Sequence, residues 1–130
     1  MDLQLQDKVI LVSGGAKGIG GAICKGLIEE GAIPVIIDPS EKEGQELLTL
    51  ANGKALHLKK RLFSSEDTNS VVQETLRAFG RIDGVVNNAG TNDGVGLENG
   101  NPEDFLKSVE KNLGHYFYLA HFALKSLKKS

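Results

Sequence analysis

Near its N-terminus the chain reads Val9-Ile10-Leu11-Val12-Ser13-Gly14-Gly15-Ala16-Lys17-Gly18-Ile19-Gly20, an apolar run that passes directly into a glycine-rich segment. A continuous apolar run of this length is typical of a buried strand in a parallel sheet. Glycine tolerates the positive φ that a tight turn needs, so the segment suits a turn from a strand into a helix. We therefore predict a strand at residues 8–12 and a helix at residues 18–30 that Gly31 closes.

The same rhythm of apolar run and helical pattern continues to the end of the chain. Further strands are expected at residues 33–37, 54–58 and 82–86, and further helices at residues 40–51, 64–79 and from 101 almost to 130. Cap residues mark the helix starts, and they are Ser40 with Glu43, Ser64 with Asp67, and Asn101 with Pro102 and Asp104. Alternating strands and helices without a linker predict one α/β domain on a parallel sheet.

The glycine spacing restricts what the first turn can bind. Gly14, Gly18 and Gly20 form Gly-x-x-x-Gly-x-Gly, whereas a Gly-x-Gly-x-x-Gly pattern fails in every frame, and no Gly-Lys-Ser/Thr follows for a P-loop. Backbone amides at a helix N-terminus attract a diphosphate, and no acid lies between Asp7 and Glu29 to repel one. We predict nucleotide binding, with a plain packing turn as the alternative.

Asp38 follows the second expected strand, about 20 residues beyond the turn, where a carboxylate can accept hydrogen bonds from ribose hydroxyls. This position favours NAD. Lys17 argues for NADP, since a cation near the turn suits a 2'-phosphate, but the carboxylate should repel that phosphate by about 4 kcal/mol at about 4 Å. An ion pair between an exposed lysine and that phosphate contributes only about 0–1 kcal/mol. The alternative for Asp38 is an ordinary turn residue before Pro39.

The composition excludes several functional classes. The net charge is -2, which gives no electrostatic attraction for nucleic acid or an anionic membrane. The apolar runs fall far short of the roughly 18 residues of a membrane span, so we expect no membrane partner. Cys24 is the single cysteine, which excludes an intrachain disulfide and a cysteine metal cluster. No metal site is predicted, and the reducing cytoplasm is the expected location.

Two further motifs complete a family pattern. Asn87-Asn88-Ala89-Gly90 follows the fourth strand, and Lys111-Asn112-Leu113 lies on the last helix. With the glycine turn and Asp38, these residues resemble the short-chain dehydrogenase/reductase family along essentially the whole chain. The resemblance implies a Rossmann-type doubly wound sheet, here with about four strands in the order 3-2-1-4. It also implies a cofactor site at Ser13, Gly14, Lys17, Gly18, Ile19, Gly20, Asp38, Leu62, Asn88, Ala89 and Gly90.

The resemblance gives Asn112 the first place in the family's Asn-Ser-Tyr-Lys catalytic set. From the residues alone, Asn112 lies in an apolar stripe at helical spacing with Phe105, Val109, Tyr116, Leu119 and Ala123, and a core amide bonded to backbone is the alternative. The loop at residues 91–100 resembles sugar dehydrogenases of the L-fucose dehydrogenase type. Asn92 and Asp93 are therefore candidate substrate residues, with a solvated loop as the alternative. Packing or a subunit contact is expected of His115 and His121.

One part of the family pattern is not found. In the family's catalytic set the Lys follows the Tyr at the fourth place, as Tyr-x-x-x-Lys. Here Ala120 and Phe122 stand at the fourth place after Tyr116 and Tyr118, so neither tyrosine matches. We therefore expect the N-terminal, cofactor-binding part of an NAD-dependent dehydrogenase of secondary alcohols or sugars, inactive by itself. A non-catalytic dinucleotide-binding module is the main alternative, and a methyltransferase is a weaker one.

Two further expectations come from the resemblance. A homodimer or homotetramer built on paired helices is implied. At the end of the third strand the family usually has an Asp near the adenine, and Arg61 stands in that segment here, so adenine is expected to be held by backbone alone or less tightly.

Overall fold

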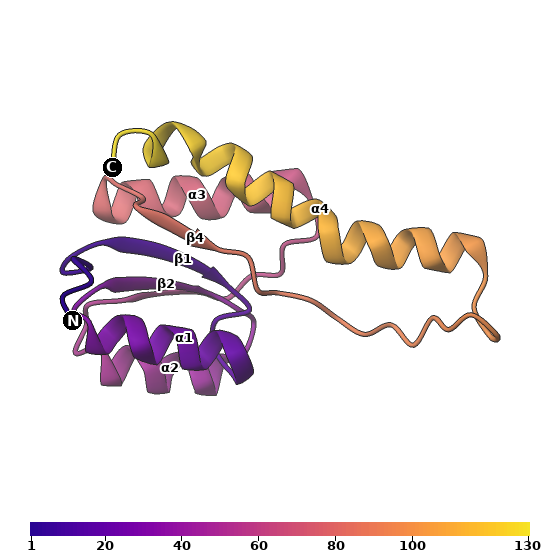
Figure 1. Cartoon of the computed structure of the whole chain (residues 1–130), viewed down its shortest axis with the longest axis horizontal. Helices are drawn as coiled ribbons and strands as arrows, with labels where there is room; N and C mark the ends of the chain where they lie inside the picture. The colour runs from indigo at the N-terminus through magenta and orange to yellow at the C-terminus, as the bar shows by residue number, and fades with distance from the viewer.

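The structure, a computed structural model, describes all of residues 1–130. Its elements are β1 (Val9–Ser13), α1 (Gly18–Glu29), β2 (Ile33–Ile37), α2 (Glu41–Leu50), β3 (Leu56–Leu58), α3 (Ser65–Phe79), β4 (Gly84–Val86) and α4 (Pro102–Leu127). The four strands are parallel and lie in the order β3-β2-β1-β4, which confirms the predicted sheet. Helices α1 and α2 cover one face of the sheet, and α3 and α4 cover the other (Figure 1).

Strand β1 is buried along its whole length because both faces of the sheet are covered. Successive side chains point to opposite faces, so Leu11 packs in a core with residues of α3 and α4, while Val12 packs in a second core with residues of α1 and α2. Two hydrophobic cores therefore hold the carboxyl end of β1 in place from both sides.

The outer strands are shorter than predicted. β3 begins at Leu56 rather than residue 54, because the amide of Lys54 donates to Ala51 O in the preceding turn. β4 begins at Gly84 rather than residue 82, because Asp83 accepts the amide of Val9 on its side chain at 2.8 Å. The half-buried β3 lies at the sheet edge, as the expected strand order 3-2-1-4 requires.

Two of the three predicted helix caps form. Ser64 Oγ accepts the amide of Asp67 at 3.1 Å, and Asn101 Oδ1 accepts the amide of Asp104 at 2.9 Å. The capping box predicted for Ser40 and Glu43 is wrong, because Ser40 makes no side-chain cap bond. Asp38 instead accepts the amide of Ser40 at 2.8 Å and leads the chain into α2.

Helix α4 packs on the sheet only along its second half. Its first half runs out beyond the sheet (Figure 1), and Phe105 and Val109 are exposed there, so the predicted apolar stripe through Asn112 is wrong for that half. The buried side chains are His115, Leu119 and Ala123, one helical turn apart. No helix of the chain is long and apolar enough to cross a membrane.

Candidate functional site: a cleft at the carboxyl ends of the strands

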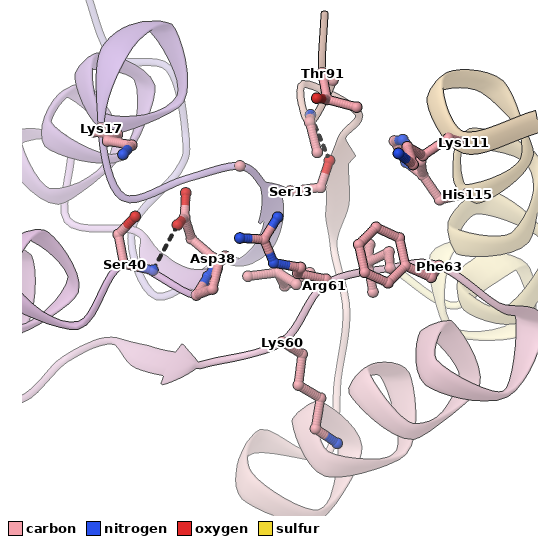
Figure 2. Close-up of a pocket in the computed structure, with 16 residues that line it drawn as sticks. Ser13, Lys17, Asp38, Ser40, Lys60, Arg61, Phe63, Thr91, Lys111 and His115 are labelled. Atoms are coloured by element: carbon pink, nitrogen blue, oxygen red, sulfur yellow. Dashed lines mark hydrogen bonds between the residues drawn. The ribbon is translucent and has the colours of Figure 1, made fainter. Parts of the chain in front are cut away.

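A cleft of about 280 Å³ opens where the carboxyl ends of the strands meet (Figure 2). Ligands of open α/β sheets bind at this edge. Five segments line the cleft: the end of β1 with Ser13, Gly14 and Lys17; the end of β2 with Asp38, Pro39 and Ser40; the segment after β3 with Lys60, Arg61, Leu62 and Phe63; the segment after β4 with Ala89, Gly90 and Thr91; and α4 with Lys111 and His115.

The glycine turn has the geometry that the sequence predicted. Gly14 and Gly18 have φ of 63° and 60°, the left-handed region that glycine tolerates best. A Cβ on Gly20 would overlap the carbonyl oxygen of Gly14, so the first turn of α1 lies directly against the preceding backbone. The N-cap residue Lys17 makes no side-chain cap bond, so the backbone amides at the start of α1 are available to an anion.

Hydrogen bonds join this turn to the segment after β4. Ser13 Oγ accepts the amides of Asn88 and Ala89 at 3.0 and 3.1 Å. Asn88 Nδ2 donates to the Gly14 carbonyl oxygen at 3.1 Å. The two segments that resemble family motifs are thus one hydrogen-bonded unit, with Asn88 holding the turn and Ala89 and Gly90 lining the cleft.

Asp38 is held in a fixed orientation at the opposite wall. Its carboxylate accepts the amides of Ala16 and Ser40 at 3.2 and 2.8 Å, and it is 7% exposed. His57 Nε2 lies 2.8 Å from the Asp38 carbonyl oxygen and supports the same residue from β3. Carboxylate oxygens have more than one lone pair each, so Asp38 can still accept from a ligand in the cleft.

Four cations line the cleft, and two of them have partners in the protein. Lys60 Nζ lies 3.1 Å from a carboxylate oxygen of Glu74, and Lys111 Nζ lies 3.3 Å from one of Asp93. Lys17 and Arg61 take part in none of the five ion pairs of the chain. The Arg61 guanidinium instead lies 5.9 Å from the centre of the Phe63 ring at the rim of the cleft.

Two polar side chains of α4 have different surroundings, and of the two only His115 lines the cleft. Asn112 is fully engaged: Oδ1 accepts the amide of Thr91 at 2.6 Å, and Nδ2 donates to Ser108 O at 2.9 Å. His115 is 4% exposed, and its Nδ1 is buried without a hydrogen-bond partner. Burial lowers the pKa of His115, so the imidazole is neutral at pH 7.

The structure does not bring every predicted site residue to the cleft. Gly18, Ile19 and Gly20 form the start of α1 next to it, and the Ile19 side chain is 75% exposed. Asn92 and Asp93 lie in the loop beyond Thr91 and do not line the cleft, since Asn92 Oδ1 accepts the amide of Gly94 and Asp93 pairs with Lys111.

Sequence reasoning missed Phe63 and Lys111 as cleft residues and gave His115 only a packing or contact role. The signal for Lys111 and His115 was their spacing, because they continue towards the N-terminus, one helical turn apart, the row of Leu119 and Ala123 that is buried on α4.

Cys24 and metal ligation play no part in the site. Cys24 is completely buried, and burial raises the pKa of its thiol to about 12, so it is protonated and unreactive at pH 7. No three His, Cys, Asp or Glu side chains lie close enough together to hold a metal ion.

Comparison with known proteins places the chain in a family. The family model described as short chain dehydrogenase matches residues 8–130. The chain belongs to the short-chain dehydrogenase family. It is 35% identical over 131 residues to an L-fucose dehydrogenase of Bos taurus, covering 100% of this chain and 48% of that protein. The resemblance that the sequence motifs suggested is therefore confirmed.

Solved structures of short-chain dehydrogenases have the same fold. The crystal structure of Cj0485 dehydrogenase matches with a TM-score of 0.90 at 38% identity, over 99% of this chain and 50% of that one. An L-sorbose reductase from Gluconobacter frateurii, complexed with NADPH and L-sorbose, matches with a TM-score of 0.89 at 25% identity, over 99% of this chain and 51% of that one. The chain thus spans about half the length of the relatives it matches.

Proposed function

We propose that the chain is the cofactor-binding part of an NAD-dependent short-chain dehydrogenase that transfers hydride between nicotinamide and a secondary alcohol or sugar. The observation that carries this proposal is the position of Asp38. Its carboxylate is fixed by two backbone amides at the rim of a cleft that also contains the glycine turn. A carboxylate at this position accepts hydrogen bonds from the adenosine ribose and repels a 2'-phosphate.

The chain's residues fit a dinucleotide. Gly20 leaves no room for a side chain beside the turn, and the free amides at the start of α1 would hold the diphosphate while Asp38 holds the ribose. Ala89 and Gly90 would guide the molecule towards its reactive end. When bound, the nicotinamide supplies the hydride acceptor or donor. Asn112, as the proposed catalytic residue of this segment, fixes the backbone at Thr91 through its Oδ1.

We propose that these 130 residues alone do not turn over substrate. Neither tyrosine is followed by Lys at the fourth place, so no tyrosine with a neighbouring lysine is available as the general acid and base. Loss of such a group typically lowers the rate about 10²- to 10⁴-fold. NAD-dependent oxidation of any sugar by the purified chain would contradict this proposal.

The proposed substrate class is a sugar or another secondary alcohol. Support comes from the similarity to L-fucose dehydrogenase and L-sorbose reductase. Asn92 and Asp93 are the proposed contacts to hydroxyl groups. Both are exposed and follow Thr91, which lines the cleft, although Asp93 would have to release Lys111.

We also propose that the protein forms a homo-oligomer and acts in the cytoplasm. Helix α4 exposes large apolar side chains, Leu106 and Leu113 in its first half and Phe117 just beyond it, and their exposure to water is unfavourable. A free thiol at Cys24 is compatible with a reducing compartment.

The proposed function is tested by the cofactor preference of an Asp38→Asn variant. Binding of NADH and NADPH to the purified chain is measured by the change in nicotinamide fluorescence. The wild type should prefer NADH, and Asp38→Asn should bind NADH about tenfold or more weakly, because a neutral amide with one accepting oxygen replaces the charged acceptor. NADPH binding should strengthen, since the repulsion of the 2'-phosphate is removed.

An exposed acid on α3 provides the matched control. Glu66→Gln removes one negative charge without touching the cleft and should leave both affinities unchanged. Urea denaturation checks that Asp38→Asn is folded. Equal NADH affinity of the wild type and Asp38→Asn would overturn the assignment of Asp38 to the ribose.

A further inference from the structure

His115 is a buried polar side chain that the proposed function leaves without a task. It is 4% exposed, and it lines the cleft from α4 while its Nδ1 has no partner in the protein. Buried polar atoms are nearly always hydrogen bonded, so an unpaired one at the wall of a binding cleft indicates a partner supplied by the ligand. Figure 2 shows Lys111 and His115 with their nitrogen atoms on the side of the helix that faces the cleft.

The surroundings of His115 define what that partner can be. Tyr116 packs edge-on against the imidazole with ring centres 4.7 Å apart, which restricts its rotation. Burial lowers the pKa of His115, so a positive charge on the imidazole is disfavoured. The two nitrogens of a neutral imidazole point in different directions, so the one that faces the cleft can pair with a single polar atom of a neutral ligand.

The base of a bound dinucleotide offers such an atom in this part of the cleft. If Asp38 holds the adenosine ribose and the diphosphate lies at the glycine turn, the base extends from Asp38 away from that turn. The remaining walls there are the apolar Leu62, the ring of Phe63 and the α4 side chains. The Phe63 ring and Leu62 offer apolar contacts to a flat purine, whose 6-amino group and N1 can meet the polar side chains of the same walls.

We propose that His115 reads the base of the cofactor by hydrogen bonding the 6-amino edge of adenine. This inference rests on the proposed function, because it needs the adenosine ribose at Asp38. It gives the cleft a side-chain contact to the base although Arg61, which has donors only, occupies the segment after β3. His115 is thus a binding residue that selects adenine over a purine without the amino group.

The test compares NADH with its reduced 6-deamino purine analogue, in which hydrogen replaces the 6-amino group, so that neither imidazole tautomer finds a partner at that position. Binding of both to the purified chain is measured by nicotinamide fluorescence. The wild type should prefer NADH by about tenfold, which corresponds to one hydrogen bond in a buried site. His115→Leu has an apolar side chain of similar size in place of the imidazole and should bind the two dinucleotides with nearly equal affinity.

His121 supplies the matched control on the same helix. It is exposed, stacks on Phe117 with ring centres 5.4 Å apart, and does not line the cleft, so His121→Leu should keep the tenfold preference. Equal binding of the two dinucleotides by the wild type overturns the inference about His115 and leaves the proposed function standing. An unchanged preference in His115→Leu does the same. Binding of neither dinucleotide by the wild type overturns both.

Discussion

Gly20 and Gly26 lie on the same helix, but an alanine would meet different surroundings at the two positions. A Cβ at Gly20 overlaps the Gly14 carbonyl oxygen and approaches Asn88 Nδ2, and the backbone atom cannot move away without opening the turn. A Cβ at Gly26 meets nothing within 4 Å. The glycines of one helix therefore serve different purposes, and only the first is tied to the site.

Alanine substitutions separate these two purposes. Gly20→Ala should destabilise the chain by about 1–3 kcal/mol, because it overfills a packed contact. Gly26→Ala should stabilise it by about 0.5–1 kcal/mol, because alanine loses less conformational entropy in a helix. Urea denaturation of both variants gives the free energies of unfolding. A Gly20→Ala variant as stable as the wild type would show that the turn is not packed as described.

Residue-level prediction succeeded where local chemistry alone decides the outcome. The glycine turn and the caps at Ser64 and Asn101 formed as expected, because each depends on residues close in sequence. The cap at Ser40 did not, because Asp38 accepts the Ser40 amide first. That competition depends on the fixed orientation of Asp38, which the amide of Ala16, far along the chain, helps to set.

At the scale of elements, Asp83 connects β4 to β1 by its side chain. Its carboxylate is 5% exposed, accepts the amide of Val9 at 2.8 Å, and forms two hydrogen bonds with Arg81 at 2.8 and 2.7 Å. Burial alone would raise the pKa of Asp83, but the bonds from Arg81 and Val9 outweigh it and hold the pKa below its usual value. No sequence motif indicated this residue.

The lowered pKa of Asp83 predicts a dependence of stability on pH. A carboxyl group with a depressed pKa in the folded state stabilises fully above its unfolded pKa of about 3.9, and this stabilisation disappears as the pH falls through the folded value. Asp83→Asn should therefore be less stable than the wild type at pH 7, and the difference should shrink below about pH 4. Urea midpoints measured from pH 7 to pH 3 check this; a constant difference would refute it.

Helix α4 shows why its orientation was only partly predictable. The sequence indicated a long helix with a cap at Asn101, and both are present. Helical periodicity fits several neighbouring stripes in this segment, and the stripe through Tyr116 was chosen instead of the stripe through His115. Burial of His115 is decided by the cleft that the other strands build, and periodicity within α4 does not contain that information.

For the whole molecule, the alternation of strands and helices predicted a parallel sheet, and the family resemblance supplied the strand order that the structure has. The residues of the cleft were predicted only in part. Gly14 and Asp38 were expected at the cofactor site because they follow the ends of strands, and Leu62 was expected from the family resemblance, whereas Phe63 and Lys111 were missed. These two reach the cleft from segments whose path depends on the packing of α3 and α4.

The exposed face of α4 predicts self-association of the chain. Leu113 and Phe117 are 60% and 68% exposed on the outer part of the helix, and an apolar surface of this kind favours burial against another copy. Sedimentation velocity should show a concentration-dependent increase in mass for the wild type. A Leu113→Gln and Phe117→Gln double variant should shift towards the monomer, and a wild type that stays monomeric at high concentration would count against the prediction.

The central claim is that the cleft at the carboxyl ends of the strands is the dinucleotide site, and an NMR titration tests it most directly. NADH is added to the ¹⁵N-labelled chain, and the backbone amide shifts are followed residue by residue. We predict saturable changes that concentrate at residues 14–20, at Asp38 and at Ala89 and Gly90, with β3's outer edge and the C-terminal turn unaffected. Absent shifts, or shifts that gather on another face of the chain, would contradict the claim.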